Sequence, residues 1–385
     1  MKTKLLIDTH LQYSYNVVSH GSAPTIFMDA PELKIPWSHW MAELTLEDIA
    51  KQVGVSRSTV SRVVNGSPNV SPEVRKRVLK AIQATGYQPN AAARSLASQR
   101  SRMLGLVLPR SVSSFFTDPF FPQLTQGIAY GCNSNDLTLS LFLVANHEDE
   151  EKLYPRISRS GLLDGVLVQS GQPDDRLVER LAKSSLPTVM IGRPFEPGGV
   201  NYIDVDNVMA AIAATQHLVN LGYQRIATIT GNPDSTVTQD RLKGYRRAIT
   251  NAGRMVDEQL IETGDFSDNS GYEAMKRLLT YRPDAVFAAS DVMAVGAMRA
   301  AREAGLGIPD DVAFVGFDDL PLAENSLIKL TTVRQPISRL GAHAVELLLD
   351  VIANGIKPLR HVILGTELIV RESCGAKKLE ALSSG

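Results

Sequence analysis

The sequence of 385 residues predicts an N-terminal all-α helix–turn–helix domain, followed by an α/β domain of two doubly wound, parallel-sheet lobes. Two observations support this fold class. Residues 45–89 hold three short amphipathic stretches with helix caps, and residues 103–372 alternate apolar strand-like runs with amphipathic helical stretches. The second pattern predicts parallel sheets covered by helices on both faces, and its length suffices for two such lobes.

The charges are spread unevenly along the chain, although the formal net charge is only -1. Residues 45–102 hold ten Lys and Arg against three acidic residues, a net charge of +7, whereas residues 103–385 carry a net charge of -7. A basic segment joined to an acidic body is typical of a polyanion-binding module attached to a solvated partner domain. Chance clustering of charges is the plain alternative.

Several classes of protein lack support in the sequence. Cys132 and Cys374 lie far apart without metal or redox spacing, so they indicate neither a metal site nor an oxidising compartment. No apolar run approaches the roughly 18 residues of a membrane span, and the apolar start ends at Ile7, too early for a secretion signal. Common nucleophile, phosphate-binding and zinc-protease motifs are absent. We therefore expect a cytoplasmic protein that is not an enzyme and has no catalytic residue, metal or cofactor.

Residues 1–44 show neither helical nor strand periodicity over a useful length, and contain one glycine and three prolines among polar residues. This composition predicts a disordered extension. Patterned sequence begins directly after Met41, so a start of translation at this methionine stays open as an alternative.

Three capped helices are predicted within residues 45–89. Thr45, with Asp48 three residues later, indicates a capping box at the start of the first helix. Ser56 is placed to cap the second helix, and Ser71 before Pro72 opens the third. A short helix, a turn containing glycine and a second helix with a polar outer face describe a helix–turn–helix.

The polar outer face of the second helix is the candidate DNA-reading surface, formed by Arg57, Ser58, Thr59, Ser61, Arg62 and Asn65. Arginine can hold guanine through two hydrogen bonds in the major groove, so Arg57, Ser58 and Arg62 are assigned to base reading. The other three suit phosphate contacts, which fix register without reading sequence. A solvated polar face that binds no nucleic acid is the alternative interpretation.

From residue 103 onward, strands and helices are expected to alternate. The expected strands are 104–108, 137–144, 165–168, 188–191, 226–230, 285–288 and 312–315, and the expected helices are 121–134, 148–159, 207–221, 238–252, 270–281, 292–304 and 337–354.

Two strings resemble signatures of the lactose-repressor (LacI) family. They are residues 46–66 (LEDIAKQVGVSRSTVSRVVNG) and 86–96 (GYQPNAAARSL), and the resemblance continues to about Glu372. It implies that residues 103–372 form a periplasmic-binding-protein-like domain, which closes on a small effector and dimerises. Ligands in such sheets bind beyond the carboxyl ends of the strands.

Residues 90–102 are expected to form a hinge helix and linker. Asn90 can cap a helix over the alanine-rich residues that follow, but eight residues are too few for a stable isolated helix. The helix should form only against its dimer mate and DNA. Leu96 occupies the position of the family's minor-groove wedge, and its small neighbour Ala93 suits such an insertion. A plain linker is the alternative.

The resemblance also implies the effector-binding residues, which are Asp118, Phe120, Arg241, Phe266, Ser290 and Asp318. Aromatic faces combined with Arg and Asp groups suit a polyhydroxy ligand, so we expect a carbohydrate effector. Two residues next to these positions have purely structural interpretations: Phe121 as a core residue and Asp291 as a helix cap. Asp319 is ambiguous between a ligand-binding and a structural role.

Taken together, these features predict a sequence-specific transcription regulator, most commonly a repressor in this family, that binds a near-palindromic operator. A homodimer is expected, with residues 337–354 as one contributor, because Leu379 and Leu382 in the tail at 373–385 are too few for a coiled coil. The rival function is an extracellular solute-binding protein with the same two lobes. The missing secretion signal and the basic helix–turn–helix disfavour it.

Overall fold

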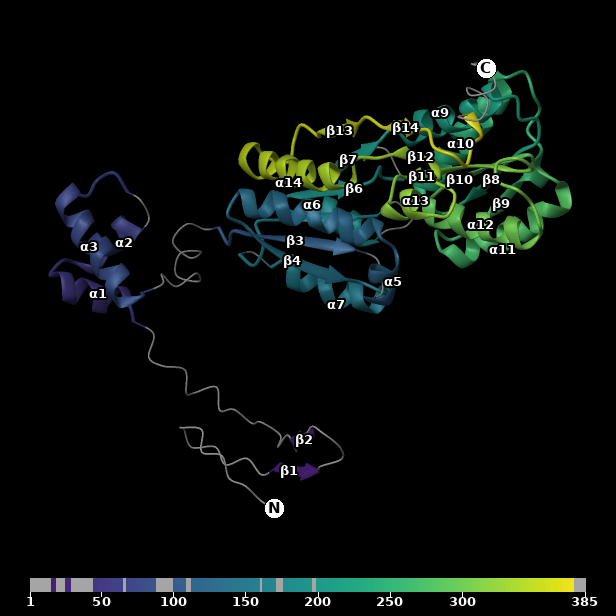
Figure 1. Cartoon of the computed structure of the whole chain (residues 1–385). Coiled ribbons are helices and arrows are strands. Elements are labelled where there is room, and N and C mark those ends of the chain that lie inside the picture. The colour runs from purple at the N-terminus through teal and green to yellow at the C-terminus, as the bar shows by residue number, and fades with distance from the viewer. Residues whose placement is uncertain are drawn as a thin grey trace, which may run out of the picture. The chain divides into compact units, whose positions relative to one another are not determined.

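The computed structural model describes residues 15–18, 25–28, 44–64, 67–87, 100–108, 112–159, 161–170, 176–195 and 199–376. The chain divides into two compact units, Met1–Asn90 and Ala91–Gly385, each of which is considered by itself (Figure 1). Within the described residues, no helix is long and apolar enough to cross a membrane. The assignments of residues 1–44 as an extension and 90–102 as a hinge stay predictions.

A short strand pair lies in the predicted extension, where we expected no regular structure. Strand β1 (Tyr15–Val18) pairs antiparallel with β2 (Thr25–Met28). Both segments are rich in β-branched and aromatic residues, which favour strands. A lone two-stranded pair is only marginally stable in water.

The predicted helix–turn–helix is present, with helices α1 (Leu46–Val53), α2 (Arg57–Val64) and α3 (Pro72–Thr85). Thr45 and Asp48 form the capping box in both directions, and Ser71 caps α3 as expected. The backbone N–H of Thr59 donates to Ser56 Oγ at 3.2 Å, which caps α2. The helices share one buried core, composed of Ile49, Ala50, Val53, Val60, Val63, Val78 and Tyr87.

Lobe 1 of the second unit is a six-stranded parallel sheet in the order β13-β7-β6-β5-β3-β4. Its strands are β3 (Met103–Leu108), β4 (Thr138–Leu143), β5 (Gly165–Gln169), β6 (Thr188–Ile191), β7 (Asn201–Val205) and β13 (His361–Leu364). Helices α6 (Phe120–Ser134) and α14 (Ile337–Asn354) cover one face, whereas α7 (His147–Ile157) and α8 (Arg176–Ala182) cover the other (Figure 1). A short helix, α5 (Val112–Thr117), precedes α6.

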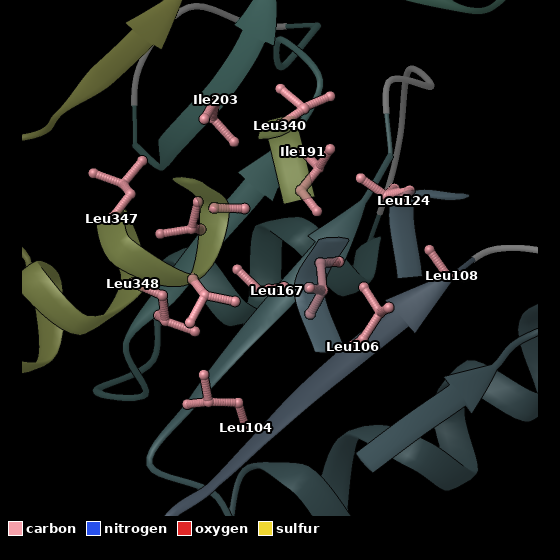
Figure 2. Packing of buried hydrophobic residues seen from close by; sticks show 14 of the residues in the cluster. Leu104, Leu106, Leu108, Leu124, Leu167, Ile191, Ile203, Leu340, Leu347 and Leu348 are labelled. Atoms are coloured by element: carbon pink, nitrogen blue, oxygen red, sulfur yellow. The ribbon is translucent and has the colours of Figure 1, made fainter. Parts of the chain in front are cut away.

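Figure 2 shows the apolar packing on one face of the lobe 1 sheet. Leu104, Leu106 and Leu108 point from β3 toward Leu124 of α6 and the leucines of α14. Val107, between them, packs on the opposite face. A strand buried on both faces needs apolar side chains at successive positions.

Lobe 2 repeats this arrangement with the order β14-β12-β11-β10-β8-β9, in which only β14 is antiparallel to its neighbour. Its strands are β8 (Ile226–Thr230), β9 (Ile261–Thr263), β10 (Ala285–Ala288), β11 (Ala313–Asp318), β12 (Thr331–Arg334) and β14 (Glu367–Ile369). Helices α9 (Asn207–Asn220) and α10 (Thr236–Asn251) cover one face, and α11 (Asp268–Leu278) and α12 (Asp291–Glu303) the other. Helix α13 (Pro321–Asn325) follows β11.

The chain crosses between the lobes at three places in the described residues: after β7, between β12 and α14, and between β13 and β14. The predicted fold class is confirmed, but the sequence pattern missed β7, β9, β12, β13 and β14. These strands are short, and four of them contain charged or amide side chains. Their pairing therefore depends on neighbouring strands more than on their own pattern.

Candidate functional site

A cavity of about 740 Å³, including its opening to solvent, lies between the two lobes. Its residues come from both sheets, mostly at the carboxyl ends of strands, where ligands bind in open α/β sheets. All six expected effector residues line it, namely Asp118, Phe120, Arg241, Phe266, Ser290 and Asp318. That these residues bind an effector stays a prediction.

Arg241 is the central cation of the cavity and is only 5% exposed. Its Nε donates to Oδ1 of Asn207 at 2.9 Å, and its guanidinium carbon lies 3.5 Å from the centroid of the Phe317 ring. Its Nη1 donates to the carbonyl of Ala289 and lies 3.7 Å from Oδ1 of Asp318. A buried guanidinium needs such partners, because desolvation disfavours its charge and lowers its pKa.

Two buried carboxyl groups face this arginine from different lobes. Asp318 ends β11 and accepts from Nε2 of Gln335, while Asp204 of β7 accepts from the backbone N–H of Arg193 at 2.8 Å. Burial raises the pKa of Asp318 to about 7, although the charge of Arg241 lowers it. Burial likewise raises the pKa of Asp204 to about 6. Asp318 and Asp204 can therefore carry a proton near neutral pH. In their ionised form, both can accept hydrogen bonds from the hydroxyl groups of a ligand.

Backbone strain marks the end of β11. Asp318 and Asp319 have φ values of 118° and 57°, which side-chain-bearing residues rarely adopt. Their carboxylates have separate partners, because Asp319 pairs with Arg334 and Arg371 at 2.6 Å while Asp318 faces the cavity. Such strain persists only where the surroundings over-determine it, and it is frequent at binding sites. Asp319 is thus an ion-pair residue outside the cavity.

The helix that follows β10 corrects one expectation. Ser290, not Asp291, caps α12, since its Oγ accepts from the N–H of Met293 at 3.2 Å. Asp291 is fully buried and accepts from the N–H of Leu320 at 2.8 Å and from the hydroxyl of Thr332. Asp291 therefore fixes the loop after β11, which positions Asp318.

Aromatic rings provide the apolar surface of the cavity. Phe121 is 2% exposed and belongs to the core of lobe 1, as expected, but it also borders the cavity beside Phe120. Phe266 has a φ of 71°, and its ring lies so close to Gly231 that an added Cβ there would stand 2.1 Å away. A flat apolar surface beside polar groups is the arrangement that binds sugar rings.

Five polar residues of the cavity escaped the sequence analysis: Gln169, Asp204, Asn207, Ser235 and Gln335. Gln169 ends β5, and its Oε1 is buried with no hydrogen-bond partner among the described residues. An unpartnered buried carbonyl is costly, so this atom suits a donor on a ligand. An amide at the end of an apolar strand is the only sequence signal it offers.

An ion pair joins the lobes beside the cavity. Arg193, after β6 of lobe 1, binds both carboxylate oxygens of Asp240 on α10 of lobe 2, at 2.9 and 3.0 Å. The hydroxyl of Thr236 also donates to the Arg193 carbonyl at 3.0 Å. Asp240 directly precedes Arg241 on α10, so this contact between the lobes lies one residue from the central cation.

The raised pKa of Asp318 gives a testable pH dependence. In the unfolded chain this carboxyl titrates near its ordinary value of 3.8, so between about pH 4 and 7 the folded state holds a proton that the unfolded state has released. The free energy of unfolding should therefore increase as pH falls through this window. We expect the melting temperature of wild type, relative to Asp318→Asn, to rise when the pH is lowered from about 8 to 5. A difference that is constant with pH would contradict this.

On the first unit, the predicted DNA-reading residues of α2 share one face. Arg57, Ser58 and Arg62 are exposed, Thr59 and Ser61 are half-buried, and the valines between them pack inward. The hydroxyl of Ser56 lies 2.8 Å from those of Ser58 and Thr59. The other predicted DNA contacts, Asn65, Asn90, Ala93 and Leu96, lie outside the described residues.

Comparison with known proteins identifies both parts of the chain. Residues 45–90 match the family model of bacterial regulatory proteins of the lacI family, and residues 215–374 match a periplasmic binding protein-like domain. The chain is 39% identical over 333 residues to the HTH-type transcriptional regulator CelR of Thermobifida fusca, which covers 86% of this chain and 98% of that protein.

Two solved structures share the architecture. The complex of the transcriptional regulator CelR with cellobiose has a TM-score of 0.69 at 38% identity, covering 86% of this chain and all of the other. The lac repressor dimer bound to operator and the anti-inducer ONPF has a TM-score of 0.76 at 26% identity, covering 86% and 99% of the two chains. By its helix–turn–helix, its two-lobed sensor fold and these similarities, the chain belongs to the lacI family of bacterial regulatory proteins.

Proposed function

We propose that this protein is a DNA-binding transcription regulator, most simply a repressor, whose affinity for a near-palindromic operator is controlled by an uncharged carbohydrate. The observation that carries the proposal is the convergence of Arg241, Asp318 and the aromatic rings on one cavity of a lacI-family chain. The exposed arginines of α2 supply the matching DNA-reading surface.

The charges of the cavity favour a neutral effector. Three carboxyl groups, on Asp118, Asp204 and Asp318, line it against the single guanidinium of Arg241, which already has protein partners. A phosphorylated sugar would bring a further negative charge into this buried site and meet repulsion. Sugar hydroxyls, in contrast, can donate to the carboxylates and to Gln169. The cellobiose complex of the relative CelR makes a disaccharide of glucose the first candidate.

We assign the protein to the cytoplasm, without an enzymatic role, and as a homodimer. Each assignment follows the regulators that it resembles, one of which was solved as a dimer on its operator. The apolar face of α14 packs inside lobe 1, so any contribution of residues 337–354 to the dimer must come from its opposite face. The lacI-family DNA-binding domain argues against an extracellular solute-binding role.

A thermal-shift and DNA-binding experiment tests this function. Cellobiose, glucose, glucose 6-phosphate and adenine are each added to the full chain. A neutral sugar at a hundred times its dissociation constant should stabilise the second unit by about 2.7 kcal/mol, and glucose 6-phosphate should not. Binding to duplex DNA should weaken steeply with salt. Stabilisation by glucose 6-phosphate and by none of the neutral sugars would contradict the neutral effector. Failure to bind duplex DNA at every salt concentration would contradict the function as a DNA-binding regulator.

A further inference from the structure

The chain enters lobe 1 through two residues that are held by a single carboxylate. Oδ1 of Asp164 accepts from the backbone N–H of Ser101 at 2.6 Å and from its hydroxyl at 3.0 Å. Oδ2 accepts from the backbone N–H of Arg102 at 2.9 Å. Both oxygens are thus used, and charge-assisted bonds of this kind are stronger than neutral ones.

The position of Asp164 in the sheet explains how it reaches these residues. It directly precedes β5, which pairs with β3, and its own N–H donates to the carbonyl of Met103 at 2.8 Å. Arg102 has a φ of 57°, a left-handed conformation that a side chain makes unfavourable. The carboxylate therefore fixes a strained turn immediately before β3.

Lobe 2 contains the same kind of contact, in which an aspartate carboxylate accepts from two successive backbone N–H groups. Asp284 directly precedes β10, and its carboxylate accepts from the N–H groups of Gln224 at 2.7 Å and Arg225 at 2.8 Å, just before β8. Both aspartates are half-buried. They differ in what they hold, because the Asp284 turn joins α9 to β8 within the lobe. The Asp164 turn instead holds the end of the segment that comes from the DNA-binding unit.

We propose that Asp164 is a positioning residue for DNA binding: it fixes the end of the linker to lobe 1, so that effector-dependent movement of the lobe is passed to the helix–turn–helix. This proposal rests on the proposed function. Ser101 and Arg102 are where the linker joins lobe 1 covalently, so a displacement of lobe 1 moves the end of the linker with it. Without the anchor, the linker would pivot at this point, and a smaller fraction of molecules would hold the DNA-competent arrangement.

The test compares Asp164→Ala with Asp284→Ala in the full chain, because the matched variant removes the same kind of anchor without touching the linker. The DNA probe is the duplex that wild type selects from a random-sequence pool, and the effector probe is cellobiose. Both variants should lose a similar amount of thermal stability and keep the same cellobiose-induced shift. Only Asp164→Ala should bind the selected duplex about tenfold more weakly, with a reduced response of DNA binding to cellobiose.

A milder substitution at the same position controls for a folding defect. Asp164→Asn keeps one acceptor oxygen, so its DNA affinity should lie between those of wild type and Asp164→Ala. Equal DNA affinity of the Asp164 and Asp284 variants, or an Asp164→Asn protein with wild-type affinity, would overturn the proposal. If cellobiose does not bind wild type, the comparison of DNA affinities decides alone. If wild type selects no duplex, the proposed function itself fails, which is a different result.

Discussion

Replacing Arg241 with alanine should abolish the effector response while leaving operator affinity within about twofold of the unliganded wild type. Arg241 joins groups from α9, β11 and the residue after β10 in the cavity, and it belongs to the second unit, whereas the residues predicted to read DNA belong to the first. Arg241 holds Asn207 and lies beside Asp318 at the cavity, so its loss removes the group that orders these ligand-facing side chains. The thermal shift caused by a neutral sugar should therefore disappear.

The fold should survive this substitution. Asp318 loses its cationic neighbour, but its pKa is already raised to about 7 by burial, so it can take up a proton instead of staying charged and unpaired. Asp318→Ala should likewise remove the effector response. The matched control is Arg246→Ala, on the same helix, where the side chain pairs with Glu258 at the surface. It should bind the sugar normally.

The direction of the DNA phenotype also reveals the sign of regulation. A ligand alters DNA affinity only by binding the competent and incompetent lobe arrangements unequally. If the effector is an inducer, Arg241→Ala and Asp318→Ala should repress permanently. If it is a corepressor, both should fail to bind operator tightly. A variant that folds normally and responds with unchanged effector affinity would show that the substituted residue has no ligand role.

Replacing Arg57 or Arg62 with alanine should weaken binding to the cognate operator by about 1–3 kcal/mol and relax specificity locally. Both side chains are exposed on α2, whose opposite face packs on the core of the helical domain through Val60 and Val63. An arginine that holds guanine by two hydrogen bonds distinguishes bases, so the loss on random DNA should be small. Fluorescence anisotropy on both duplexes at one fixed salt concentration measures the ratio.

Lys76→Ala on α3 is the control for this experiment. Lys76 is exposed and basic but lies outside the reading face of α2. Its loss should weaken cognate and random DNA to a similar, small extent, as expected for a phosphate contact. If the Arg57 and Arg62 variants behaved like Lys76→Ala, these arginines would contact phosphate only, and base reading would have to be assigned elsewhere.

Much of this molecule is encoded locally. The capping box of Thr45 and Asp48 and the Ser71 cap are read from neighbouring residues, because each is completed within four positions of the chain. The two-face burial of β3 likewise appears as an unbroken apolar run. The six expected effector residues were predicted from the family resemblance and not from the sequence pattern, and the structure brings all of them to one cavity.

The helix–turn–helix and the two-lobed fold class could be predicted from the sequence, as could, through resemblance, the family and the six effector residues. The folded structure adds Asp204, Gln169 and Gln335 to the cavity and ties the lobes through Arg193 and Asp240. These added contacts link residues from different strands and lobes. They form only when the three crossings of the chain have brought the strand ends of the two lobes together, and no local periodicity records that approach.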